Sequence, residues 1–138
     1  MTIWRLAVPL GLLAAPRAIF HDLDLVREGT LVNAALVFVP LLIWIVVAAR
    51  RAARPFLTLL AAGGVYGACL ALVHNVFWSR AFEGDPPALG GNLAGRLSPG
   101  AEDLLFRGAM SVTSLFTGLA VGAVCGAVAW GVTRLLRR

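Results

Sequence analysis

The sequence contains no lysine, only two cysteines and two histidines, and few charged residues of any kind. Of its 138 residues 14% are charged, whereas a soluble domain carries about 25%. Hydrophobic residues make up 59%, and the mean hydropathy is +0.85. These shortages exclude a disordered chain, a disulfide-stapled secreted domain and an ordinary soluble enzyme. The composition is typical of an integral membrane protein with one domain.

The positions of the basic residues are typical of a membrane protein and not of a nucleic-acid interface. All twelve are Arg, against seven acidic residues, which gives a net charge of +5. A nucleic-acid interface would interleave basic and aromatic residues on one polar face, whereas these Arg residues flank apolar runs. We therefore expect a lipid bilayer as partner and no nucleic acid.

Long apolar runs predict the fold class. Three runs without Asp, Glu or Arg reach the roughly 20 residues that a span requires; they cover 31–49, 55–78 and 108–133. A fourth run, 3–20, carries Arg near both ends and suffices if those side chains reach the interface. A signal peptide and an interfacial helix are its alternatives. The sequence predicts an all-α, four-helix membrane bundle, 1–138, with a Gly/Pro-rich outer loop at 79–107.

Charge asymmetry predicts the orientation. One side would hold seven Arg and no acidic residue, and the other five Arg and all seven acidic residues. The positive-inside rule then places both termini in the cytoplasm of a multi-pass plasma membrane protein, in a bacterium the inner membrane. Tryptophans lie mostly near span ends, and we interpret them as interfacial anchors; they are Trp4, Trp44, Trp78 and Trp130.

Small residues at helical spacing predict a packing seam between the last two spans. In lipid, small residues let helix backbones approach closely. Antiparallel alignment places Gly67 opposite Gly118 and Gly63 opposite Gly122, with Gly126 continuing the stripe. The same stripe could serve a homodimer, and the sequence does not choose between the two.

Polar residues inside the spans gather toward the outer side. We expect a polar pocket there, formed by His74, Asn75, Asn33, Ser111 and Ser114. An unperturbed histidine titrates near pH 6.5, so His74 could carry a proton or sense pH. The alternative is that His74 and Asn75 only bond a neighbouring helix or reach headgroup water.

Other candidate sites are weaker. The His21–Asp24 segment mixes possible metal ligands, but we interpret it as a solvated connector in which Asp22 or Asp24 caps a helix. His21 and His74 could together ligate one b-type haem, which nothing else supports. The two cysteines lie in apolar runs without a C-x-x-C motif. We therefore expect no metal, no cofactor and no catalytic residue.

Residues Glu102–Gly108 resemble the E-E-x-x-x-R element of CAAX-processing intramembrane metalloproteases. That family implies later F-x-x-x-H and H-x-x-x-N elements as metal ligands, and no histidine follows His74 in this sequence. Asp103 also stands where the family has its second Glu. We interpret the segment as a helix start, with Ser98 as cap and Pro99 in the first turn.

Three functions remain open. The leading hypothesis is a non-enzymatic accessory protein that binds a membrane protein partner or forms a homo-oligomer. The second is a carrier or channel for a small solute or ion, with its site around His74. The third is a membrane-embedded enzyme or haem protein. No Walker A, G-x-S-x-G or H-E-x-x-H motif supports that third hypothesis.

Overall fold

The computed structural model describes residues 2–27, 29–82 and 84–136, and within these ranges it contains helices and no strand. In chain order the elements are α1 (Trp4–Ala14), α2 (Pro16–Asp22), α3 (Leu31–Arg51), α4 (Pro55–Val76), α5 (Trp78–Ala81), the 3-10 turn η1 (Gly91–Leu93) and α6 (Pro99–Leu136). Three of them, α3, α4 and α6, are long and apolar enough to cross a membrane. The predicted all-helical class is confirmed, and the fold is consistent with a helical membrane protein.

The sequence had indicated one helix over the first apolar run, 3–20, but the structure divides this run. It is divided into α1, of 11 residues, and α2, of 7 residues. Pro16 has no amide hydrogen to continue the helical ladder, and the carbonyl of Leu12 instead accepts the amide of Ala15 at 3.2 Å. Because α1 alone is too short to cross a bilayer, a crossing here would require both helices.

The last helix begins earlier than the apolar run at 108–133 suggested, which shortens the loop expected at 79–107. The carbonyl of Ser98 accepts the amides of Ala101 and Glu102, so α6 begins at Pro99. One turn further, Asp103 pairs with Arg107 at 2.8 Å, an i,i+4 contact that supports the helix. At 38 residues α6 is about 57 Å long, nearly twice the hydrocarbon thickness of a bilayer.

Backbone contact joins α4 to α6 along the glycine positions of the predicted seam. A methyl group placed on Gly63 would lie 2.8 Å from the Cα of Gly122, and one on Gly118 would lie 2.5 Å from the Cα of Gly67. Gly126 continues the contact against the carbonyl of Phe56. No side chain larger than hydrogen fits these positions without movement, so the glycines set the distance between the two helices.

Trp44 joins α1 to α3 in the interior, although the sequence suggested an interfacial anchor. Its ring is fully buried and packs edge-on against Tyr66, with 6.1 Å between the ring centroids. The indole N–H donates to the carbonyl of Leu10 at 2.6 Å, so the polar atom is satisfied inside the core. Trp78 is also buried, and only Trp4 and Trp130 keep the exposure that an anchor requires.

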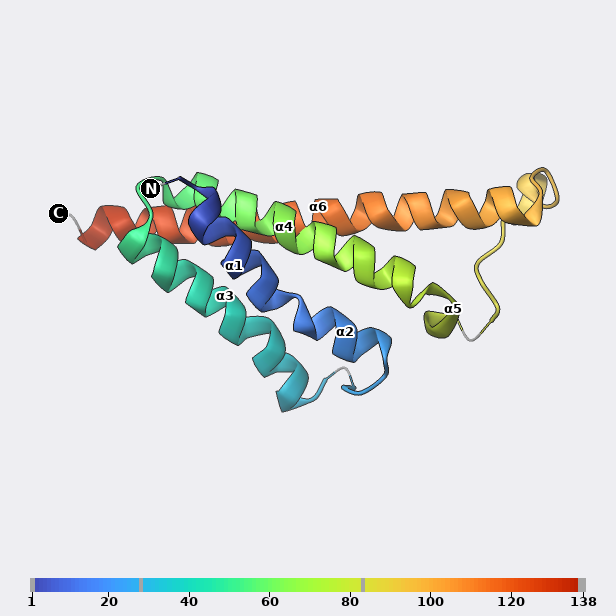
Figure 1. Cartoon of the computed structure of the whole chain (residues 1–138), viewed down its shortest axis with the longest axis horizontal. Helices are drawn as coiled ribbons and strands as arrows, with labels where there is room; N and C mark the ends of the chain where they lie inside the picture. Colours follow the sequence, from blue (N-terminus) through green and yellow to red (C-terminus); the bar gives the residue numbers. More distant parts are fainter. Residues whose placement is uncertain (1, 28, 83, 137–138) are drawn as a thin grey trace.

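The helices are close together at one end and spread apart at the other (Figure 1). The end of α3, the start of α4 and the last turns of α6 meet at the N-terminus, and we call this the basic end because it carries Arg50, Arg51 and Arg54. At the opposite, open end, the start of α3 lies away from α4 and α6. In the most apolar window of α3 only 17% of the residues are buried, compared with 44% in α4.

Candidate functional site

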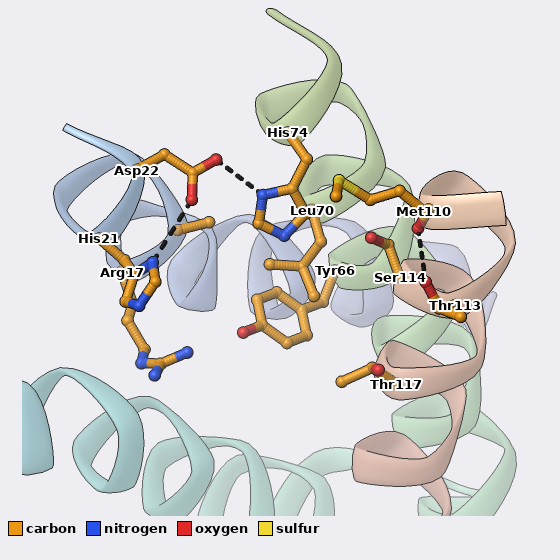
Figure 2. Close-up of a pocket in the computed structure, with 11 residues that line it drawn as sticks. Arg17, His21, Asp22, Tyr66, Leu70, His74, Met110, Thr113, Ser114 and Thr117 are labelled. Carbon is orange, nitrogen blue, oxygen red and sulfur yellow. Dashed lines mark hydrogen bonds and ion pairs between the residues drawn. The ribbon is translucent and has the colours of Figure 1, made fainter. Parts of the chain in front are cut away.

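A cavity of about 380 Å³ lies at the open end, between α2, α4 and α6 (Figure 2). Each helix supplies one wall with a distinct chemistry. From α2 come charged side chains, from α4 an imidazole above apolar and aromatic groups, and from α6 a row of hydroxyls. The polar lining residues are Arg17, His21, Asp22, Tyr66, His74, Thr113, Ser114 and Thr117.

Asp22 and His74 form the central contact of this cavity. The Nδ1 of His74 lies 2.7 Å from the Oδ2 of Asp22, which ties the end of α2 to the last turn of α4. The side chain of Asp22 is only 4% exposed, and that of His74 is 28% exposed. The carboxylate holds one ring nitrogen, and the other is turned toward the cavity. A fixed imidazole with one free nitrogen can bond or exchange a proton with a ligand.

The contacts of Asp22 overturn its interpretation as part of a solvated connector with a capping role. Its other oxygen lies 3.5 Å from the Nδ1 of His21, and its side chain is buried. The cap of the following helix is Thr30, whose hydroxyl accepts the amide of Asn33 at 3.2 Å and donates to the carbonyl of Arg27. Asp22 is thus free for a tertiary contact because a local residue caps α3.

Arg17 brings a permanent positive charge to the cavity wall. Its Nε–H donates to the Oδ1 of Asn33 at 3.3 Å, which connects α2 to the first turn of α3. The guanidinium is half-buried and lies on the cavity side of α2, near His21 (Figure 2). Asn33, predicted as a pocket residue, therefore does not line the cavity but orients Arg17, which does.

Hydroxyl groups line the side of the cavity that α6 forms. Ser114 is 5% exposed and lies at the α4–α6 contact, while Thr113 and Thr117 are more exposed. The Thr113 hydroxyl bonds the carbonyls of its own helix at 2.9 and 3.1 Å. Tyr66 and Leu70 of α4 close the cavity between these hydroxyls and α2.

Asn75 and Ser111, two of the five predicted pocket residues, form a separate network between the end of α4 and α6. The Asn75 amide donates to the Ser111 hydroxyl at 2.9 Å. Arg107 donates to the carbonyl of Asn75 at 3.0 Å and lies over the ring of Trp78 at 5.0 Å. This network closes the end of α4 against α6, and neither Asn75 nor Ser111 lines the cavity.

The sequence thus grouped residues that the structure separates. Of the five predicted residues, His74 and Ser114 line the cavity, Asn33 supports it, and Asn75 and Ser111 lie elsewhere. Sequence reasoning placed Arg17 at the interface and did not join it or Asp22 to His74. One signal was available, because a charged residue close to an apolar run is a functional candidate by default.

Within the described ranges, no cluster of three or more His, Cys, Asp or Glu side chains could hold a metal ion. His21 and His74, considered for haem, both line the cavity, but each has a ring nitrogen directed at Asp22. Cys69 and Cys125 are both free thiols.

In comparisons with known proteins, no family model, no curated protein and no solved structure matches the chain. Its class is therefore defined by the fold itself, an all-helical chain with three helices able to cross a membrane.

Proposed function

We propose that this chain is a four-pass plasma membrane protein with both termini in the cytoplasm, and that α1 and α2 form the first pass. The asymmetry of the Arg residues supports this topology, since Arg50, Arg51 and Arg54 share the basic end with the last turns of α6. The cavity with His74 then opens at the outer side of the membrane.

We further propose that the protein binds a small polar or charged solute in this outer cavity, the role of a carrier or of a binding subunit. The observation that carries this proposal is the Asp22–His74 pair at the wall of a cavity that also holds Arg17. A carboxylate that is 4% exposed must be compensated, and the imidazoles of His74 and His21 lie at its two oxygens. The cavity volume falls within the range of about 300–1,000 Å³ found for ligand sites.

Native mass spectrometry of the protein released gently from its own membrane tests this function. We expect a stoichiometric small-molecule adduct on the wild type, with occupancy at least about tenfold lower in Asp22→Asn and His74→Gln because each loses one side of the pair. Asp85→Asn is the matched control, since Asp85 is exposed on the connection before η1. Bare wild-type protein, or equal occupancy in all variants, would contradict the proposal.

A second candidate function is assembly with another membrane protein or with a second copy of this chain. It is favoured by α3, in which only Pro40, Trp44 and Ala48 are buried and the start lies away from the other helices. Small residues and unpartnered helix faces drive association in lipid. The same mass spectra test it, because a complex of higher mass supports assembly and a strict monomer contradicts it.

A further inference from the structure

The outer cavity adjoins a second hollow, a groove of about 200 Å³ between α3 and α6. Arg17, Tyr66 and Thr117 line both hollows, so the two are adjacent, and we call them together the cleft. Away from these shared residues, the groove is bounded by side chains without charge or hydrogen-bonding groups: Ala14, Leu36, Val37, Leu41 and Val121.

The cleft therefore changes from polar to apolar along the helix axes. On α4 it runs from His74 to Tyr66, about 12 Å along the helix. On α6 it runs from Met110 to Val121, about 16 Å. Under the proposed topology the polar part lies at the outer surface and the apolar part extends toward the middle of the bilayer. This is the orientation of an amphiphile in the outer leaflet.

The charge at the junction of the two hollows is positive. Arg17 uses its Nε–H for Asn33, which leaves both terminal nitrogens of its guanidinium for a ligand within the part of the chain that the structure describes. Among the lining residues that the structure describes, Asp22 is the only acidic one, and the imidazoles of His74 and His21 lie against its two oxygens. Planar guanidinium groups bind phosphate oxygens in a bidentate manner. An anionic head is therefore the complementary occupant.

We propose that the cleft binds a single-chain anionic amphiphile of the outer leaflet, with a phosphate head at Arg17 and a hydrocarbon chain in the groove along α3. This inference rests on the proposed function, because it names the class of ligand that the outer cavity takes. Asn33 fixes the guanidinium at the junction, the hydroxyl of Thr117 can donate to the head, and Val37 and Val121 contact the chain.

Three probes distinguish the contribution of the head to binding from that of the chain, in an experiment on the full-length protein in dodecyl maltoside. They are dodecyl phosphate, inorganic phosphate, and added dodecyl maltoside as a chain with an uncharged head. Binding is measured by native mass spectrometry during titration. We expect dodecyl phosphate to bind at least about tenfold more tightly than either other probe, since head and chain contribute together.

Two variants with matched controls test each part of the cleft. Arg17→Gln should weaken dodecyl phosphate binding about tenfold or more, whereas Arg96→Gln, in the exposed connection, should not. Val37→Trp places a large ring in the groove and should weaken binding by a similar factor. Val39→Trp makes the same substitution on the same helix at a position that is 50% exposed, and it should leave binding unchanged.

The possible results distinguish this inference from the function on which it rests. If the wild type binds dodecyl phosphate no better than inorganic phosphate, or if Val37→Trp has no effect, the amphiphile is overturned. The native adduct described above would then still support a solute site. If Arg17→Gln and Arg96→Gln behave alike, the anionic head is overturned. If the wild type also carries no native adduct, both the amphiphile and the proposed function are overturned.

Discussion

The two ends of the helix assembly are held together by different means. Toward the basic end, the contact between α4 and α6 runs along glycines whose backbones touch, and Trp44 fills the space between α1 and α3. At the open end, α2, α4 and α6 meet through polar side chains around a cavity, and α3 lies apart. Backbone contact leaves no room for a ligand, whereas polar side chains that span a gap leave one.

This difference shows how a small membrane protein can keep a cavity. Close packing of small residues stabilises helix contacts within lipid, where no hydrophobic effect drives the helices together. The polar contacts at the open end compensate charges that would otherwise be costly in a buried position. The close contact at one end therefore allows the other end to remain open without separation of the helices.

The largest effect should come from the packed interior at Trp44. We expect Trp44→Ala to lower the free energy of unfolding by about 3–5 kcal/mol, since it removes a fully buried ring and leaves a cavity. Reversible unfolding in mixed detergent micelles measures the change. Trp130→Ala is the control, because Trp130 is 47% exposed and its loss should cost about 0.5 kcal/mol or less. Equal costs would show that Trp44 is not a core residue.

The glycine seam provides the second test, with one substitution at two positions of α6. Gly118→Ala should destabilise the protein by about 2–3 kcal/mol, because the methyl group would lie 2.5 Å from the Cα of Gly67. Gly108→Ala has nothing within 4 Å and should stabilise α6 by up to about 1 kcal/mol. The same unfolding measurement applies. If both variants behaved alike, α4 and α6 would not be in backbone contact.

The polar pair at the open end should contribute less than the seam. A double-mutant cycle on Asp22→Ala and His74→Ala should give a coupling free energy of about 1–3 kcal/mol, since the carboxylate is buried. The same cycle on Asp103 and Arg107, which are more exposed, should give about 0.3–0.5 kcal/mol. A coupling no larger than that of the surface pair would argue against the buried contact.

The smallest effect is expected at the helix cap of α3. Thr30→Ala should cost about 1 kcal/mol and fray the first turn of α3, because the amide of Asn33 loses its acceptor. Hydrogen exchange at that amide reports the change, and Thr30→Ser should restore protection. Faster exchange in Thr30→Ser as well would indicate that the hydroxyl is not the cap.

Sequence reasoning succeeded where residue type and spacing act within one or two helices. The alignment by depth paired Gly63 with Gly122 and Gly67 with Gly118, and the structure brings these same pairs into contact. Such a register follows from helix rise and direction alone. The helix start at Pro99 likewise follows from local chemistry, although the apolar run alone suggested a later boundary.

The candidate site could be predicted only in part, because its residues come from three helices. His74 and Ser114 were identified from their depth, but Asn75, one residue from His74, bonds Ser111 of α6 and does not line the cavity. A step of one residue turns about 100° around a helix, so neighbours in the sequence seldom share a site. The partner of His74 is Asp22, which local reasoning had considered, together with Asp24, as a helix cap.

The sequence by itself determined the helical class, the three long apolar helices and the face on which glycines join α4 to α6. Each of these follows from hydropathy, helix periodicity and the size of side chains. Only the tertiary structure decided that Trp44 is buried, that α3 stands apart at the open end, and that Asp22 meets His74 beside Arg17. These features depend on the angles between helices and on contacts between residues far apart in the chain, which no local pattern encodes.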